Sequence, residues 1–279
     1  MDMEHLKTGE VISKRRRELG LTQNQLAKSL NISFQAVSKW ENGTAYPDIE
    51  MLPKLAAELH TTVDALLGYR SVITDYDKRY DTEDYYWGLL PNRICYDLMK
   101  LLPPIKPYRV LDMGCGEGKD AVFLAKCGYA VTAFDLSSQG IEKAKRLAEH
   151  NHVDVHFFKA DLFDYSPDSE YDIIFSSGVF HFIPQPRRRE LCDNLKAHTA
   201  AGGINAMNVF VRKPFITRSQ DATEDEMRHP WYSGELFGYY HDWLFHTCRE
   251  EVFDCNSGGV PHRHCMDTLI AQKTAPDCQ

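Results

Sequence analysis

Acidic side chains end two short apolar stretches in the middle of this 279-residue chain. Asp112 lies near the end of the stretch 109–113, just before a glycine-rich turn at 114–118, and Asp135 follows the apolar stretch 129–134. Glycines let a ligand approach the backbone closely, and a carboxylate at a strand end can accept hydrogen bonds from both hydroxyls of a ribose. The pattern predicts a nucleoside-containing ligand. The acid ahead of the glycines favours a cationic group over a pyrophosphate.

Strands and helices must alternate to position these residues. Short apolar runs of strand length stand at 109–113, 129–134, 155–158, 171–176 and 204–211, and helical stretches at 119–126, 141–149 and 187–198. This alternation predicts an α/β fold, a Rossmann-like doubly wound parallel sheet with its ligand at the carboxyl ends of the strands.

Four strings in this segment, VLDMGCGEG, FDLS, KADL and YDIIFSSGVFHFI, resemble those of class I methyltransferases. The resemblance implies S-adenosylmethionine as the cofactor. It places the methionine part at the glycine turn and above the Ser176 region, the ribose at Asp135, and the adenine at Leu136, Asp161 and Leu162. The predicted cofactor-binding residues are Asp112, Gly114, Cys115, Gly116, Asp135, Leu136, Asp161, Leu162 and Ser176.

The tail from 232 to 271, together with Tyr86 and Trp87, looks like the tellurite-resistance (TehB-like) branch of these enzymes. That resemblance implies a small, soft methyl acceptor such as a thiol or a metalloid, with Tyr86 and Trp87 as a lid. The branch has a His-Arg pair before the last hairpin turn, where this chain has Phe253-Asp254. The departure puts a tellurite or selenite acceptor in doubt and leaves the acceptor unidentified.

Four side chains are candidates for the acceptor side. His181, His262 or His264 could accept a proton from a hydroxyl or amine acceptor, and Arg263 could hold an anionic one. In a strand, residues 262 and 264 share one face and Arg263 points to the other, so the two roles cannot share a face. A thiolate or selenolate acceptor needs little help from a base.

Two further kinds of site are not expected. The cysteines and histidines between 248 and 265 match no zinc-site spacing, so we expect no metal. DNA is not expected as the methyl acceptor, because the Asn/Asp-Pro-Pro-aromatic tetrad and any Pro-Cys pair are absent from the sequence.

The segment 7–69 predicts a small all-α domain of five short helices. Thr22 and Ser33 are placed to cap helices at 23–30 and 34–42, and the basic run 14–17 is expected to lie largely outside. Asp48 and Thr62 are placed to cap the fourth and fifth helices, which are expected to bury Leu52, Leu55, Leu59, Leu66 and Leu67.

The strings LTQNQLA and SFQAVSKWENG within this segment closely resemble the lambda-repressor-like (Xre) helix-turn-helix family. The resemblance implies binding of double-stranded DNA as a dimer on a two-fold site. It places base contacts at Phe34, Gln35, Ser38 and Lys39 and phosphate contacts at Gln23 and Asn42. A helical scaffold for protein contact is the alternative, since a basic footprint is expected of a DNA-binding domain.

Charge divides the chain in the same way. The formal net charge is −8, yet residues 1–70 carry equal numbers of acidic and basic side chains. We therefore expect a DNA-binding domain over 1–69, a connector with the aromatic lid over 70–108, and a methyltransferase domain over 109–279. The eight scattered cysteines and the lack of a long apolar run predict a cytoplasmic protein without a membrane partner.

Two hypotheses about function follow from the sequence. The first is an active small-molecule methyltransferase joined to a transcriptional regulator. The second is a regulator whose methyltransferase fold senses S-adenosylmethionine or a small ligand without turnover. The complete set of cofactor-facing residues favours the first.

Overall fold

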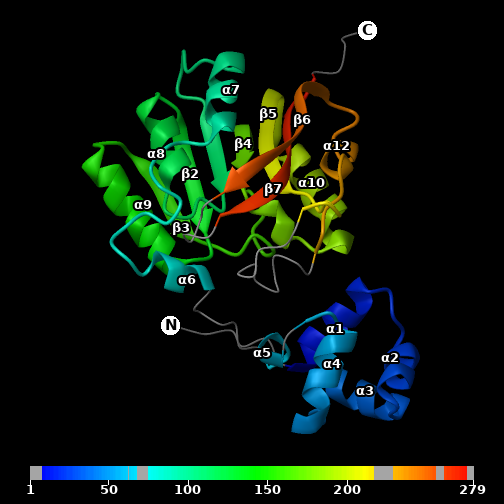
Figure 1. Ribbon diagram of the computed structural model, residues 1–279. Helices are drawn as coiled ribbons and strands as arrows, with labels where there is room; N and C mark the ends of the chain where they lie inside the picture. Colours follow the sequence, from blue (N-terminus) through cyan, green and yellow to red (C-terminus); the bar gives the residue numbers. More distant parts are fainter. Residues whose placement is uncertain (1–7, 62, 68–74, 217–228, 256–260, 275–279) are drawn as a thin grey trace. The chain divides into compact units, whose positions relative to one another are not determined.

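The computed structural model describes residues 8–61, 63–67, 75–216, 229–255 and 261–274 (Figure 1). The chain divides into two compact units, residues 1–72 and 73–279. The predicted three-part division, with a separate connector, stays a prediction. Among the described residues, no helix is both long and apolar enough to cross a membrane.

The first unit is helical, as predicted. Its elements are α1 (Thr8–Glu18), α2 (Gln23–Leu30), α3 (Phe34–Glu41), the 3-10 helix η1 (Ile49–Met51), α4 (Leu52–Glu58) and α5 (Val63–Leu66). Thr22 caps α2 through a capping box with Gln25, and the side chain of Ser33 accepts from the amide of Ala36 at the start of α3. Both predicted caps are confirmed. Asp48 makes no such bond, and the predicted cap Thr62 lies outside the described residues.

Apolar side chains from these helices form one core. Its most buried members include Ile12, Leu26, Leu30, Val37 and Leu55, each at most 2% exposed. The prediction that Leu67 is buried is wrong, because this side chain is 51% exposed. Arg16 is the exception to the prediction that the basic run 14–17 lies largely outside, because its side chain is buried beside Glu41. The buried face of α1 therefore contains one charged side chain, whose partner Glu41 is brought beside it only by the tertiary structure.

The second unit is a seven-stranded sheet in the order β3-β2-β1-β4-β5-β7-β6. Its strands are β1 (Arg109–Met113), β2 (Ala130–Asp135), β3 (Val155–Lys159), β4 (Tyr171–Ser176), β5 (Thr199–Phe210), β6 (Leu244–Cys255) and β7 (His262–Gln272). The first five are parallel, which confirms the predicted alternation. The last two are antiparallel to their neighbours, so the sheet is not parallel throughout.

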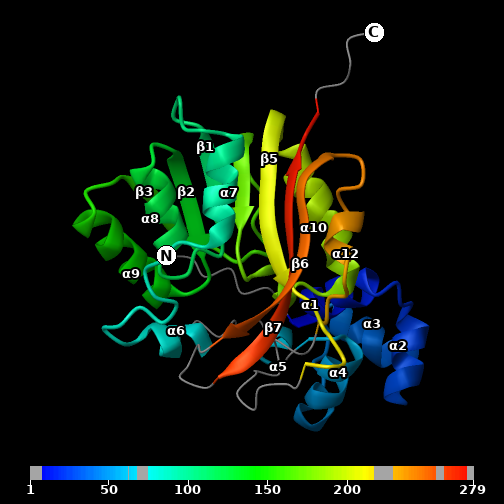
Figure 2. The same cartoon turned by 45° about the horizontal axis from the view of Figure 1, so that its top comes forward.

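Helices cover both faces of this sheet (Figures 1 and 2). Packed on one face are α7 (Arg93–Leu101), α8 (Lys119–Lys126) and α9 (Ser138–His150), whose apolar side chains meet those of β1 and β2. On the other lie η2 (Phe180–Phe182), α10 (Gln185–Ala197) and α12 (Glu235–Gly238). The short helix α6 (Asp75–Tyr80) packs against α9. The predicted ligand residues Asp112 and Asp135 lie at the carboxyl ends of β1 and β2, on the same edge of the sheet.

Candidate functional site

The glycine turn and Asp135 are joined directly at the carboxyl edge of β1 and β2. The amide of Gly116 donates to Asp135 Oδ2 at 2.8 Å, and the amide of Ser137 donates to Oδ1 at 2.8 Å. A carboxylate oxygen can accept two hydrogen bonds, so each oxygen keeps one acceptor position. Two positions side by side suit the two hydroxyls of a ribose.

Backbone geometry at the turn requires glycine. Gly114 and Gly116 have φ values of 75° and 53°, in the left-handed region. A Cβ at Gly114 would lie 2.3 Å from Val179 Cγ2, and one at Gly116 would lie 3.0 Å from the hydroxyl of Tyr80. Glycine at both positions therefore lets Val179 and Tyr80 lie directly against the backbone of the turn, and together they form a cradle that fits the predicted cofactor.

Asp112 places a buried carboxyl group beside this cradle. Its side chain is 2% exposed, and Oδ2 has no hydrogen-bond partner within the described part of the chain. Burial, with the nearby charges of Asp120 and Asp135, raises the pKa of Asp112 well above its usual range. A cation at the turn would relieve this repulsion, so the site favours the positively charged methionine end of S-adenosylmethionine.

Tyr80 and Trp87 reach the turn from the segment that precedes the sheet. The Trp87 indole nitrogen donates to the Tyr80 hydroxyl at 3.0 Å, and the ring of Tyr86 packs edge-on against Trp87 at 4.8 Å between centroids. Asp77 anchors α6 by accepting hydrogen bonds from Ser137 Oγ at 2.6 Å and the amide of Gln139 at 3.2 Å. Sequence reasoning identified the aromatic segment but missed Tyr80 and Asp77 as the residues that meet the turn.

A buried ion pair holds the turn from its other side. Lys143 Nζ on α9 lies 2.6 Å from Glu117 Oε1, and both side chains are 2% exposed. Glu117 Oε2 also accepts from the amide of Trp87 at 3.3 Å. The pair therefore connects α9, the glycine turn and the aromatic segment.

The remaining predicted cofactor residues are divided between surface and core. Leu136 is 42% exposed beside the turn, and Asp161 Oδ1 accepts from the amide of Phe163 at 2.9 Å. Cys115 is half-buried, and burial raises the pKa of its thiol. Ser176 is fully buried, with its hydroxyl donating to the carbonyl of Met113 at 2.9 Å. Its side chain thus secures β4 to the end of β1 within the protein core.

Histidines and aromatic rings line the same edge beyond β4. His181 is 5% exposed, and its ring lies against Phe182 and Phe210, with centroids 4.0 and 5.1 Å away. The ring of His264 lies 4.6 Å from Phe210 on the other side. Burial lowers the pKa of His181 to about 3 and, with the charge of His262, that of His264 to about 4. Both rings are therefore neutral near pH 7.

Arg263 points away from this group, as the strand period predicts. Its side chain is 62% exposed and pairs with Asp254 at 3.4 Å, whereas His262 and His264 are half-buried on the opposite face, with their Nε2 atoms 2.7 Å apart. The structure thus brings three of the four predicted acceptor-side residues together and separates Arg263 from them.

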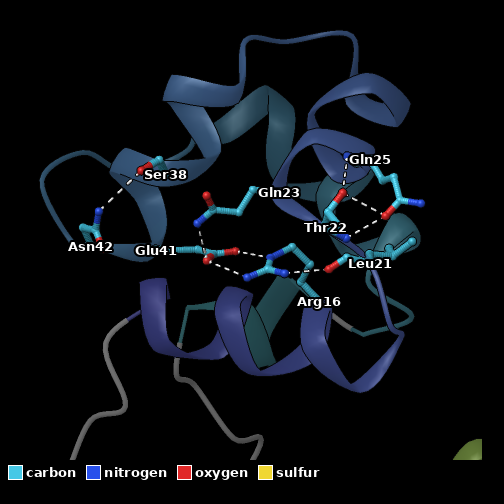
Figure 3. Close-up of polar contacts among 8 residues, drawn as sticks. All are labelled: Arg16, Leu21, Thr22, Gln23, Gln25, Ser38, Glu41 and Asn42. Atoms are coloured by element: carbon cyan, nitrogen blue, oxygen red, sulfur yellow. Dashed lines mark hydrogen bonds and ion pairs between the residues drawn. The ribbon is translucent and has the colours of Figure 1, made fainter.

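The predicted DNA-facing residues of the first unit lie on the outer face of α3. Phe34, Gln35 and Lys39 are exposed, and Ser38 Oγ accepts weakly from Asn42 Nδ2 at 3.4 Å (Figure 3). Val37 and Trp40 point the other way into the core. Gln23 differs from the rest because its side-chain amide donates to Glu41 Oε2 at 2.7 Å.

Glu41 is the centre of a buried polar cluster that fixes α3 on α1 (Figure 3). It accepts from Arg16 Nε at 2.5 Å and Nη2 at 3.0 Å, while Arg16 Nη1 donates to the carbonyl of Leu21 at 2.6 Å. Burial opposes ionisation of Glu41, but the bonds from Arg16 and Gln23 outweigh it and hold its pKa below the usual range.

We expect Glu41→Gln to lower the free energy of unfolding of the first unit by about 1–3 kcal/mol, the typical cost of a lost charged hydrogen bond. Because the pKa of Glu41 is lower when folded, its contribution is complete above the unfolded pKa and is lost as pH falls through the folded value. In Glu41→Gln the stability of the first unit should therefore not show this decrease as the pH is lowered. Amide hydrogen exchange in α1 and α3 of the full chain measures both effects. The exposed Glu18→Gln is the control, and equal exchange in the two variants would contradict the prediction.

Comparison with known proteins gives the same two parts. Residues 79–258 match the family described as tellurite resistance protein TehB, and residues 12–66 match a helix-turn-helix family. A relative from Haemophilus influenzae, described as "Probable S-adenosyl-L-methionine-dependent methyltransferase TehB", is 26% identical over 77% of this chain and 72% of its own length.

Solved structures share the fold of the second unit. The crystal structure of TehB from Haemophilus influenzae is 25% identical, with a TM-score of 0.58 over 71% of this chain and 66% of that one. A Haemonchus contortus phosphoethanolamine N-methyltransferase, solved with S-adenosyl-L-methionine, has a TM-score of 0.54 over 73% of this chain and 61% of its own. At 16% identity it shows the fold alone.

The family match covers well over half of the chain, and the cradle of glycines, buried acid and ribose-facing carboxylate fits the cofactor of that family. The chain belongs to the TehB family of S-adenosylmethionine-dependent methyltransferases and carries a helix-turn-helix domain ahead of its methyltransferase domain.

Proposed function

We propose that this chain methylates a small, soft nucleophile, a thiol or a metalloid anion, and that its first unit binds double-stranded DNA as a homodimer in the cytoplasm. The observation that carries the methylation proposal is the convergence of the glycine cradle, Asp112 and Asp135 at one edge of the sheet. The lid role of Tyr86 and Trp87 is part of the proposal, since Trp87 is bonded to the Tyr80 hydroxyl above the turn.

When bound, S-adenosylmethionine supplies an activated methyl group that passes to the acceptor in an in-line displacement. The protein then contributes by holding the methyl donor and the acceptor in line and by excluding water from the site. Asp112 balances the positive charge at the turn, and Asp135 fixes the ribose. Phe182 and Phe210, packed around His181, give the acceptor side an apolar lining.

The acceptor side supports a soft nucleophile because it holds neutral histidine rings and the half-buried rings of Phe182 and Phe210. A thiolate already carries the electron pair that forms the new bond, so it needs no base at the moment of transfer. Because burial lowers the pKa of His181 and of His264, both rings are weak bases, which favours an acceptor that binds already as its anion. The acidic second unit also disfavours a nucleic acid as the acceptor.

Turnover tests this proposal. The purified chain is incubated with labelled S-adenosylmethionine and a panel of thiol, metalloid oxyanion, hydroxyl and amine acceptors, and the methylated products are identified by mass spectrometry. We expect products from the thiol or metalloid members. Methylation confined to amines or hydroxyls would refute the acceptor class, and cofactor binding without any product would favour the second hypothesis.

That second hypothesis is a regulator that senses S-adenosylmethionine without turnover. It is the alternative because residues 12–66 match a helix-turn-helix family and the same chain has a complete cofactor cradle. It predicts that cofactor binding changes the affinity for DNA, which requires the ligand to prefer one state of the protein. A shift in operator affinity on adding S-adenosylhomocysteine would support it.

We expect Gln35→Ala to weaken specific DNA binding by about 1–3 kcal/mol and to relax the preference at one base pair, because glutamine can bond bidentately to adenine. The operator is first selected from a pool of random duplexes, and affinities are then measured by fluorescence anisotropy over a range of salt. Gln185→Ala, an exposed position in the second unit, is the matched control. An unchanged base preference in Gln35→Ala would show that α3 does not read that base.

A further inference from the structure

The pairing of β6 with β7 brings together three potential metal ligands. Cys255 and His262 are directly opposite each other in the antiparallel register, and His264 lies two residues farther along β7 on the same face. One ligand atom from each residue lies within 4.8 Å of the others, and the Nε2 atoms of the two histidines are 2.7 Å apart.

The chemistry of this donor set suits a thiophilic cation. Zinc binds thiolate at ~2.3 Å and imidazole at ~2.0–2.1 Å, so tetrahedral ligand atoms lie roughly 3.3–3.6 Å from one another. The two histidine nitrogens are closer than this, at 2.7 Å, and none of the three ligand atoms is more than 4.8 Å from another, so side-chain rotation would be enough to reach the range. All three side chains are half-buried, which limits competition from water while leaving an entry path.

We propose that Cys255, His262 and His264 form a binding site for a zinc-class divalent cation, to which the described residues supply no fourth ligand. Three protein ligands and one open position are typical of catalytic rather than structural zinc sites. This proposal departs from the sequence-based expectation of no metal. That expectation relied on spacing along the chain, whereas the ligands come from a cross-strand pair and its same-face neighbour.

The position of the site suggests its use. His264 packs on Phe210 at the carboxyl end of β5, and Phe210 packs on His181, so the cluster lies on the proposed acceptor side. A thiol bound to such a cation would be deprotonated, its proton passing to solvent. Its sulfur would then attack the methyl carbon of bound S-adenosylmethionine as the methyl–sulfonium bond breaks and S-adenosylhomocysteine leaves. This consequence rests on the proposed function, but the binding of metal does not.

Cobalt(II) is the probe for the metal site, used with untagged full-length protein under reducing conditions and without acceptor. We expect one equivalent of Co2+ to give a thiolate-to-cobalt charge-transfer band, with Zn2+ displacing the Co2+. Cys255→Ser should abolish the band, and His264→Ala should weaken Zn2+ binding more than about 100-fold, since even indirect support of a metal ligand is worth 10–100-fold. Cys248→Ser, an exposed cysteine on the same strand, should leave both unchanged.

Absence of the band in the folded wild-type chain would overturn the proposal, as would a band that survives in Cys255→Ser or disappears in Cys248→Ser. S-adenosylhomocysteine binding, measured on the same samples by calorimetry, keeps the two proposals separate. Intact cofactor binding without metal binding would refute only the metal site. Metal binding without cofactor binding would refute only the methyltransferase proposal.

Discussion

Replacing Asp135 with alanine is expected to weaken the binding of S-adenosylmethionine by at least about 100-fold. The carboxylate already accepts hydrogen bonds from the amides of Gly116 and Ser137. Its two remaining acceptor positions are those assigned to the ribose hydroxyls. Hydrogen bonds to a charged group contribute about 1.5–3 kcal/mol each, so the loss of two corresponds to about 3 kcal/mol or more. Each 1.4 kcal/mol is tenfold in affinity. Calorimetric titration with S-adenosylmethionine and S-adenosylhomocysteine measures the effect.

Asp154→Ala is the matched control, because that aspartate is exposed and lies before β3, away from the turn. Asp135→Asn adds a graded variant, since the amide keeps one acceptor oxygen but turns an N–H group toward a backbone donor. We expect it to fall between wild type and Asp135→Ala. Unchanged affinity in a folded Asp135→Ala would mean that the ribose does not bind at the end of β2, and absent binding by the folded wild type would refute the cofactor site altogether.

Local chemistry explains why much of this protein could be predicted from the sequence. Thr22 and Ser33 fix the starts of α2 and α3, so the helix-turn-helix could be located to within a residue. The backbone at 114 and 116 is left-handed, a conformation that favours glycine, so the two glycines in the sequence indicate the turn. In both cases a short stretch of chain determines its own conformation, so the residue types within that stretch are enough to predict it.

Contacts between distant elements could not be predicted in this way. Arg16 meets Glu41 across 25 residues, and the tyrosine that covers the glycine turn, Tyr80, comes from a helix of six residues. The cluster of Cys255 with His262 depends on strand register, which a slip of one residue would abolish. Tertiary packing determines such features, so they cannot be predicted from the spacing of residues along the chain.

The buried ion pair beneath the glycine turn should have the largest effect on stability. Removing one member of a buried pair leaves an uncompensated charge and costs about 3–5 kcal/mol. Lys143→Met removes the ammonium from Glu117, and it also removes the bond from Nζ to the carbonyl of Asp84. For a unit of this size, 1 kcal/mol corresponds to roughly 2–4 °C, so the melting temperature should fall by about 6–20 °C. Differential scanning calorimetry of the full chain measures the shift.

Lys145→Met is the control on the same helix, because Lys145 is 51% exposed and its pair with Glu142 is a surface one. Such pairs contribute about 0–1 kcal/mol, so this variant should melt within a few degrees of wild type. The double variant Glu117→Gln/Lys143→Met should recover part of the loss, since no charge is then left buried. Equal melting of the Lys143 and Lys145 variants would show that the pair does not stabilise the turn. Recovery of stability in the double variant without recovery of cofactor affinity would show that the pair also positions the glycine turn for its ligand.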